Sequence, residues 1–388
     1  MKNNFCPFCG AEFPEETIDR CPHCGVQRKK NIILKNFYYL FIIAIIAIAI
    51  IIACILLISF YKPTDPKLLI EKGLEFQKQG DWLGALGAYD SALMINSNDA
   101  ETWNNKAWAL IQLGRYPEGL SAAEKSISIN PNLAVAWSNK AAALGYLEKY
   151  PEELEASDKA SSLDPLLESA WVNKAGALIG LGQYNEGLKA SDYAITLNPL
   201  EPKAWNNKGC ALSGLGRDSD ALDAFNKALT INTKSYETWG NKGNSLSNLG
   251  KYDEAIISYN NALAIVPNDS KIWFSEGNNF NNLKDYQSAV NAYDRALLFN
   301  TSYYEAWYNR GISQTNLGKY DDAIISYDNA LAIVPNDEKI WFNKGYNFQK
   351  LEKYQLAIDS YNHALALNAS DSSVQYNKAL AQAALEEK

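Results

Sequence analysis

Two short cysteine motifs near the beginning of the sequence carry the residues best suited to chemistry. Cys6-Pro-Phe-Cys9-Gly and Cys21-Pro-His-Cys24-Gly each place two thiols three positions apart. Four thiolates at such spacings suit one tetrahedral Zn²⁺ ion, with Cys6, Cys9, Cys21 and Cys24 as its ligands. The glycine after each pair lets the backbone turn so that N–H groups point at the sulfurs. We therefore predict a single structural zinc ion, which leaves no open coordination position for catalysis.

The competing interpretation of these cysteines is a pair of disulfides or redox-active dithiols. Two copies of the same CPxCG knuckle in one short stretch favour the metal, and His23 inside the second loop is poorly placed to be a ligand. So short a segment cannot bury a sufficient core, so the metal must supply most of its folding free energy. Residues 1–30 resemble the small zinc-ribbon modules that begin many prokaryotic membrane proteins.

A long apolar run follows the cysteine motifs. Residues 36–61 contain no charged side chain and read NFYYLFIIAIIAIAIIIACILLISFY. This length and hydropathy predict a single transmembrane helix over 37–61, between linkers at 31–36 and 62–65. A cleaved signal peptide fits less well, because the run is too long and a metal module precedes it. Basic residues are more numerous before the run than after it, which predicts a cytoplasmic N-terminus and an extracytoplasmic main body.

Tryptophan recurs every 34 residues through the rest of the chain, at Trp103, Trp137, Trp171, Trp205, Trp239, Trp273, Trp307 and Trp341. With tryptophan numbered as position 4 of each repeat, position 8 is Ala or Gly and position 27 is Ala or Ser. Position 20 is small in every repeat except one, where it is Glu153. Small residues at fixed positions let two helices per repeat approach closely, and we expect tryptophan to fill the gap between them.

A period of 34 residues is that of the tetratricopeptide repeat (TPR). The pattern resembles the TPR family over residues 66–371, with Leu69 in place of tryptophan in the first repeat. The resemblance implies an all-α, right-handed solenoid of nine repeats with a concave groove, followed by a capping helix over 372–388. The zinc-ribbon start and the lysine-rich repeats resemble TPR membrane proteins of methanogenic archaea.

In TPR proteins the first helix of each repeat lines the concave face, and position 6 of that helix is available to ligands. This position is an asparagine in almost every repeat here: Asn105, Asn139, Asn173, Asn207, Asn241, Asn309, Asn343 and Asn377. A carboxamide offers donors and an acceptor without charge. The asparagine column resembles the ladder in the O-linked N-acetylglucosamine transferase, which implies binding of an extended peptide. The competing interpretation is that these side chains pack neighbouring repeats together.

The groove also differs along its length. Position 5 is small or polar in several early repeats and aromatic in the later ones, at Phe274, Tyr308, Phe342 and Tyr376. The C-terminal third therefore looks better suited to holding apolar side chains of a ligand. Burial of these aromatics between neighbouring helices is the alternative.

Two further columns carry charge. Position 7 is Lys or Arg in every repeat but one, which has Glu276, and position 25 is Asp, Glu or Asn. Pairing within a repeat would set Glu276 against Asp294, whereas pairing position 7 with the preceding repeat sets it against neutral Asn260. The second register predicts six ion pairs, Lys106–Asp90, Lys140–Glu124, Lys174–Asp158, Lys208–Asp192, Arg310–Asp294 and Lys344–Asp328. The alternative is two independent solvated columns.

These features predict a membrane-anchored scaffold that binds proteins or peptides. The chain has two histidines, no glycine-rich phosphate loop and no nucleophile with a histidine partner, so we expect neither an enzyme nor a small-molecule substrate. Its net charge of −8 argues against a nucleic-acid partner. The zinc ribbon would serve as a small docking or stabilising module. Alternative functions are a membrane sensor that couples TPR occupancy to the zinc ribbon, and the targeting part of an enzyme complex.

Overall fold

The computed structural model describes residues 5–12, 20–27, 41–52 and 65–387. The chain divides into two units, residues 1–69 and 70–388. In the first unit, isolated antiparallel bridges join Phe5 to Glu12 and Arg20 to Gln27, and residues 41–52 are helical. Both ends of the predicted transmembrane helix, and the linker at 31–36, lie outside the described residues. Within the described ranges, no helix combines the length and hydropathy needed to cross a bilayer.

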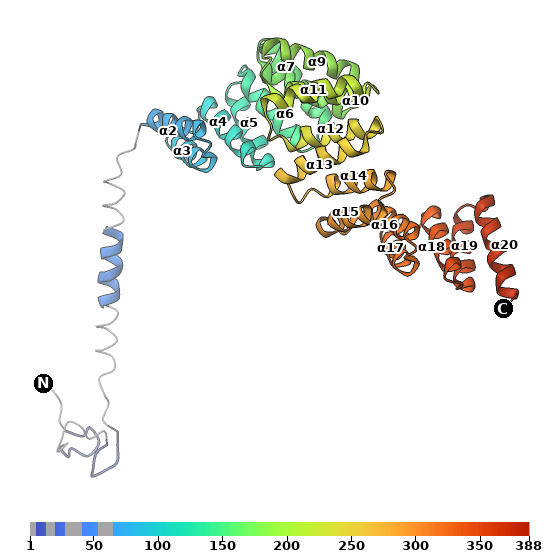
Figure 1. Ribbon diagram of the computed structural model, residues 1–388. Helices are drawn as coiled ribbons and strands as arrows, with labels where there is room; N and C mark the ends of the chain where they lie inside the picture. The colour runs from blue at the N-terminus through green and yellow to red at the C-terminus, as the bar shows by residue number, and fades with distance from the viewer. Residues whose placement is uncertain (1–4, 13–19, 28–40, 53–64, 388) are drawn as a thin grey trace. The chain divides into compact units, whose positions relative to one another are not determined.

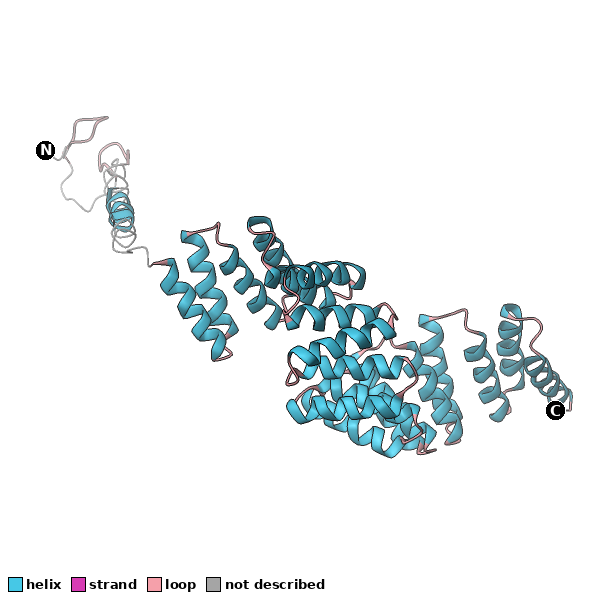
Figure 2. Ribbon diagram, turned by 90° about the horizontal axis from the view of Figure 1, so that it is seen from above, coloured by secondary structure: helices cyan, strands magenta, loops and turns pink. Residues whose placement is uncertain are grey.

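The rest of the chain is a succession of helical hairpins (Figures 1 and 2). We call the first helix of each hairpin helix A and the second helix B. The helices are α2 (Pro66–Lys78), α3 (Trp82–Ile95), α4 (Ala100–Gln112), α5 (Tyr116–Ile129), α6 (Ala134–Tyr146), α7 (Tyr150–Leu163), α8 (Glu168–Gly180), α9 (Tyr184–Leu197), α10 (Pro202–Gly214), α11 (Asp218–Ile231), α12 (Tyr236–Asn248), α13 (Tyr252–Ile265), α14 (Ser270–Asn282), α15 (Tyr286–Phe299), α16 (Tyr304–Asn316), α17 (Tyr320–Ile333), α18 (Glu338–Lys350), α19 (Tyr354–Leu367) and α20 (Ser372–Glu386). The all-α repeat array predicted from the sequence is confirmed, and α20 occupies the helix A position that follows the ninth repeat.

Turns at fixed positions set where each helix begins and ends. Helix A often begins after a side chain that accepts its free N–H groups, as Asp269 and Asp337 do. Between the two helices, position 15 takes a left-handed backbone conformation, which suits glycine because it has no Cβ. Glu148, Lys284 and Glu352 adopt the same conformation without that advantage.

Helices A and B of one repeat are held together by a fit between positions 8 and 24. Where position 8 is glycine, position 24 is a buried aromatic ring, and a Cβ on Gly311 would lie 2.6 Å from the Tyr327 ring. Two other repeats combine alanine at position 8 with serine at position 24. These pairs are Ala141 with Ser157 and Ala175 with Ser191. The array therefore uses two complementary ways to fill the same space.

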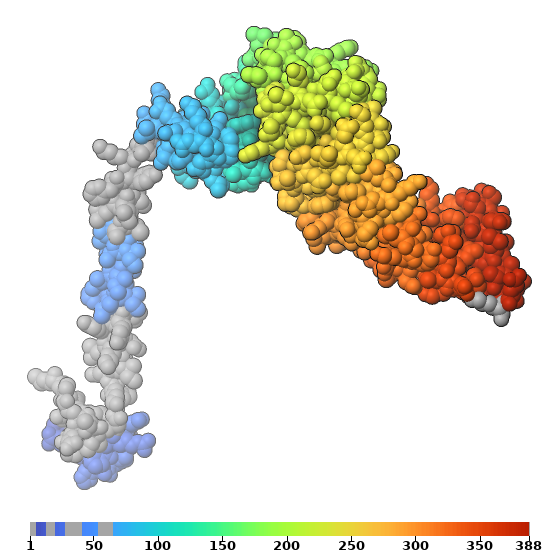
Figure 3. Space-filling view, viewed as in Figure 1, coloured from blue at the N-terminus to red at the C-terminus, as the bar shows by residue number. Residues whose placement is uncertain are grey.

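Successive helices A contact each other directly, most extensively from α4 to α10, whereas successive helices B make no comparable contacts in the described array. Helices A therefore form the inner layer of a curved stack, as the TPR resemblance implies. Small side chains permit the close approach, for example Ala142 and Gly176 at position 9. Bulky residues such as Ile312 and Tyr346 occupy that position where the inner helices lie less close. The surface of the array is continuous from repeat to repeat (Figure 3).

Candidate functional sites

The four predicted zinc ligands converge in the structure. The sulfur atoms of Cys6, Cys9, Cys21 and Cys24 all lie within 4.8 Å of one another. Two of the separations are 3.5 Å, from Cys6 to Cys24, and 3.6 Å, from Cys9 to Cys21. A tetrahedral Zn²⁺ with bonds of about 2.3 Å holds its sulfurs about 3.8 Å apart, whereas a disulfide needs about 2 Å. The cluster therefore suits a metal ion such as zinc.

The backbone of each knuckle is arranged around its first cysteine. The N–H of Gly10 donates to the Cys6 carbonyl at 3.0 Å, and Gly25 makes the same bond to Cys21 at 2.9 Å. Both glycines have positive φ, 73° and 68°. Backbone N–H groups of the Phe8–Cys9 segment donate to the Cys6 sulfur and lower the pKa of that thiol to about 6. Such donors favour the thiolate, which is the form that binds metal.

The asparagine column joins neighbouring helices A. The side-chain amide nitrogens of Asn139, Asn173, Asn207, Asn241, Asn309 and Asn343 donate to atoms of the preceding helix A over 2.8–3.3 Å. Asn377 donates to its own helix, and no hydrogen bond of the described array uses the Asn105 side chain. This geometry supports the packing interpretation for the donors. None of these bonds uses the Oδ1 atoms, which leaves a row of acceptors.

The six predicted ion pairs are all present. Their nitrogen–oxygen distances run from 2.5 to 3.1 Å, and each joins a helix A to the preceding helix B. Glu276 is 3% exposed, and its burial raises the pKa of the carboxyl to about 7, while a hydrogen bond from Asn260 opposes that rise. The register predicted from the position of this one acidic residue is therefore confirmed.

In the seven repeats that carry both a tryptophan at position 4 and a cation at position 7, the cation also lies over the tryptophan ring. The distances from the charged group to the ring centroid are 4.9–5.6 Å for Lys106, Lys140, Lys174, Lys208, Lys242, Arg310 and Lys344. Sequence reasoning missed these contacts, although a spacing of three residues on a helix indicates them. The rings are partly buried and pack against helix B of their own repeat, for example Trp171 against Tyr193 with ring centroids 4.4 Å apart, as the sequence predicted.

The edge of each tryptophan ring also forms a hydrogen bond to the loop between two repeats. Every Nε1 of the column donates to the backbone carbonyl six residues earlier, at 2.8–3.0 Å. In α20, Gln375 stands at position 4 and makes the equivalent bond to the Ala369 carbonyl at 2.8 Å. Tryptophan therefore connects the ion-pair seam to the inter-repeat loop.

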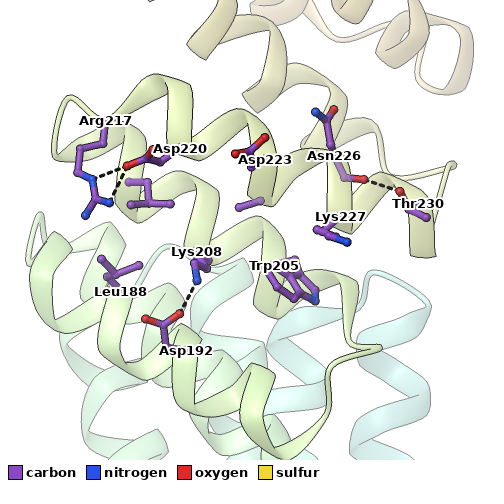
Figure 4. Close-up of a pocket in the computed structure, with 12 residues that line it drawn as sticks. Leu188, Asp192, Trp205, Lys208, Arg217, Asp220, Asp223, Asn226, Lys227 and Thr230 are labelled. Atoms are coloured by element: carbon purple, nitrogen blue, oxygen red, sulfur yellow. Dashed lines mark hydrogen bonds and ion pairs between the residues drawn. The ribbon is translucent and has the colours of Figure 1, made fainter.

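A cavity of about 740 Å³ opens along this seam between α9 and α11, over α10 (Figure 4). Trp205 and Leu188 line it together with the Lys208–Asp192 pair. At its rim, Arg217 pairs with Asp220, 2.6 Å apart. The cavity carries equal numbers of acidic and basic side chains, so its charge selects no particular ligand.

A second cavity, of about 330 Å³, lies on the inner layer of the C-terminal repeats. Its walls combine aromatic, aliphatic and amide side chains without a formal charge: Ile312, Thr315, Asn316, Tyr327, Phe342, Asn343, Tyr346 and Asn377. Phe342 also packs against Tyr361, with ring centroids 5.9 Å apart. The position-5 aromatics are thus partly used in packing, as the alternative held, yet one of them still faces this cavity.

Comparisons with known proteins agree with this repeat architecture. Models described as tetratricopeptide repeat match residues 100–133, 172–236, 236–269, 304–337 and 338–371, more than half of the chain. No curated protein matches at a significant level.

Among solved structures, a chain of the APC/C hetero-tetramer Cut9–Hcn1 is 19% identical, with a TM-score of 0.55 over 77% of this chain. The alignment spans only 59% of that chain, and at this identity the likeness shows the fold alone. A structure of MamA is 22% identical, with a TM-score of 0.41 over 42% of this chain and 96% of that one. The repeat models and the helical array together show that the chain belongs to the tetratricopeptide repeat family.

Proposed function

We propose that this TPR scaffold binds an extended segment of a partner protein on the inner layer of its C-terminal repeats. The observation that carries the proposal is the cavity formed by α16, α17, α18 and α20. Its volume of about 330 Å³ fits one or two side chains of a ligand. The walls offer apolar surface from Phe342 and Tyr346, which can hold an apolar anchor.

The amides beside the cavity supply what a peptide backbone needs. Asn343 donates to the Tyr308 hydroxyl at 3.0 Å and Asn377 donates to the Ser373 carbonyl at 2.8 Å. Each amide keeps an Oδ1 acceptor that no hydrogen bond of the described array occupies. A backbone N–H of an extended segment could be bound there without regard to its side chains.

Site-specific photo-crosslinking in the cells that produce the protein tests this function. Tyr346 is replaced by p-benzoylphenylalanine in the full-length chain, and Ile325, which is 56% exposed on α17, receives the same replacement as the control. We expect crosslinks from position 346 to map to one contiguous segment of a partner, and we expect position 325 not to capture that segment. Equal capture of the same peptides from both positions would show that the cavity is not the binding site.

We further propose that residues 37–61 hold the scaffold at a membrane, with the zinc ribbon in the cytoplasm and the repeats outside. The absence of charge over this run and the basic residues before it support the proposal. Full-length protein should remain in the membrane fraction after carbonate extraction, and a variant lacking 37–61 should not. Protease added to intact cells should digest the repeats, whereas survival of the repeats would reverse the proposed orientation.

A further inference from the structure

One carboxyl group in the array has no partner. Glu153 occupies position 20 on α7, where every other TPR repeat of the chain carries glycine or alanine. Its side chain is only 5% exposed. Among the hydrogen bonds and ion pairs of residues 65–387, none involves this carboxyl. Its oxygens are not among the fully enclosed unpartnered atoms of the described residues, so solvent reaches them, yet a largely buried charge without an ionic partner weakens a fold.

The carboxyl lies between two helices of the inner layer. A Cβ built on Gly145 of α6 would lie 2.5 Å from Glu153 Oε1, and one on Gly176 of α8 would lie 3.5 Å from the same atom. Other repeats fill this space from helix A, as Ile111 does against Gly119 at 2.9 Å. The exchange of a large residue between positions 12 and 20 explains the volume of the Glu153 side chain. It does not explain the charge, because an apolar residue would fill the space equally well.

The space above Gly176 is open and is bordered by polar atoms. Only two heavy atoms would lie within 4 Å of a Cβ at this position, Glu153 Oε1 and the Nδ2 of Asn207 on α10. This amide nitrogen is a donor, already bonded to the Val172 carbonyl at 3.0 Å, so the acceptor offered to a cation here is the Glu153 oxygen. A small slot on the inner layer is therefore lined by a carboxyl oxygen and an amide.

Within residues 65–387, no cation pairs with the carboxyl. On the two flanking helices, Lys140 pairs with Glu124, Lys174 pairs with Asp158, and Glu168 accepts from Asn198. On α10, Lys208 pairs with Asp192, and the Lys203 nitrogen donates to the Tyr146 hydroxyl at 2.9 Å. On α7 itself, Tyr150 interacts with Glu153 electrostatically, and Glu152, Glu155 and Lys159 are exposed. Burial raises the pKa of Glu153 to about 8, so the charged form lacks stabilisation that a neighbouring cation would supply.

We propose that the slot above Gly176 binds a cationic side chain, the ammonium of a lysine or the guanidinium of an arginine, with the Glu153 carboxylate as its acceptor. The cation belongs to the partner segment of the proposed function, and the inference rests on that function to this extent. The slot would add a charge-selective contact in the tightly wound repeats to the apolar contact in the C-terminal ones. A segment that spans both would be selected by two separated features.

The test uses n-butylammonium chloride as the probe and n-butanol as its neutral counterpart, with the full-length protein at constant ionic strength. A ligand that binds only the folded state raises the unfolding midpoint. At pH 9 we expect n-butylammonium, at about ten times its dissociation constant, to raise the midpoint of the wild type by about 2 °C, with a smaller effect at pH 6, where the carboxyl is protonated. n-Butanol should give no such rise.

Glu153→Gln should abolish the rise. Glu276→Gln, which removes another buried carboxyl from the outer seam, is the matched control and should respond as the wild type does. Equal shifts in Glu153→Gln and the wild type would overturn the slot, since the probe would then bind elsewhere. If the probe response depends on Glu153 but position 346 captures no partner segment, the proposed function fails and the cation site stands. If position 346 captures a partner segment but the probe response does not depend on Glu153, the cation site is refuted and the proposed function stands.

Discussion

Seven of the eight tryptophans in the repeat column make two directional contacts, one through the ring face and one through the ring edge, and Trp273, with Glu276 at position 7, makes the edge contact. The face lies under the position-7 cation, and the edge donates to the loop that precedes the repeat. Because the carbonyl belongs to the loop residue two positions after the end of helix B, as Pro199 follows Leu197, this bond ties helix A to the path of the chain between repeats.

Replacing Trp205 by phenylalanine should show the value of the edge contact. Trp205→Phe keeps most of the ring but removes the donor to the Pro199 carbonyl, so we expect a loss of about 1–2 kcal/mol of unfolding free energy. Trp82 on α3 is also partly buried but stands outside the column, and Trp82→Phe is the control. Urea unfolding followed by circular dichroism measures both. A loss as large in the control would show that ring size, and not the hydrogen bond, matters.

The buried carboxyl of Glu153 makes stability depend on pH. Its folded pKa of about 8 lies above the ordinary value of 4.5, so the unfolded chain loses this proton first as pH rises. The folded state is therefore destabilised progressively from about pH 4.5 to about pH 8. Glu153→Gln should remove this loss and raise unfolding free energy at pH 8 by an amount on the order of 3 kcal/mol, with almost no gain at pH 4. A gain independent of pH would contradict the assignment.

Among single-residue contacts, the ion pairs could be predicted from the charges in the sequence. The hydrogen bonds of the tryptophan Nε1 atoms could not, because they depend on the path of the backbone. The sign of Glu276 was sufficient to choose the register of the ion pairs. The bond from each tryptophan edge depends on where a loop carbonyl points, and no residue type reveals that. The asparagine donors could be read either way, because a carboxamide suits both a ligand and a neighbouring helix.

Between neighbouring elements, the ion-pair seam is incomplete at Glu276 and can be completed by substitution. Asn260→Asp alone would set a second carboxylate against Glu276, whose pKa is about 7, so it should destabilise the protein at pH 8. Adding Glu276→Lys reproduces the pairing found at Lys344 and Asp328, 2.5 Å apart. In a double-mutant cycle at pH 8 the second change removes the repulsion and adds an ion pair, so we expect a favourable coupling above the roughly 0.5–1 kcal/mol of the pair alone. A coupling near zero would mean that the seam contributes no interaction energy.

The fit between positions 8 and 24 can be tested in the same way. Gly311→Ala places a Cβ 2.6 Å from the Tyr327 ring, and such overpacking should cost about 1–3 kcal/mol. In the background of Tyr327→Ser, which imitates the repeat with Ala141 and Ser157, the same Gly311→Ala change should cost little or even stabilise helix α16. Thermal and urea unfolding of the four proteins gives the coupling. An equal cost in both backgrounds would refute the complementarity.

Helix pairs and their order were predictable from the 34-residue period, because each repeat restates the same small and large positions. The change in packing along the array was less accessible. It requires positions 5 and 9 of one helix to be compared with the next helix A, and that contact is set by the curvature of the whole stack.

On the scale of the whole molecule, the cysteine cluster and the repeat array belong to separate units. The cysteine cluster has almost no apolar core, whereas the array has a core in every repeat. Metal removal by a chelator, or Cys21→Ser, should therefore release one Zn²⁺ per chain and leave the melting transition of the array unchanged. Metal analysis and circular dichroism at 222 nm follow the two events. A lowered melting transition of the array would show that the units stabilise each other.

The near-identity of α13 and α17 has a consequence for how the gene can change length. Residues 251–274 and 319–342 differ at only three positions, so recombination between their coding sequences would delete or add two whole repeats. In a deletion, the hybrid helix B would be followed by α18, whose Lys344 pairs with the carboxylate of Asp328 in the present array. A crossover upstream of Asn260 retains Asp328 and a complete seam, whereas one downstream leaves Lys344 opposite an asparagine. The two deletion products would therefore differ in stability. Which product forms depends on whether the DNA crossover falls before or after the codon for Asn260.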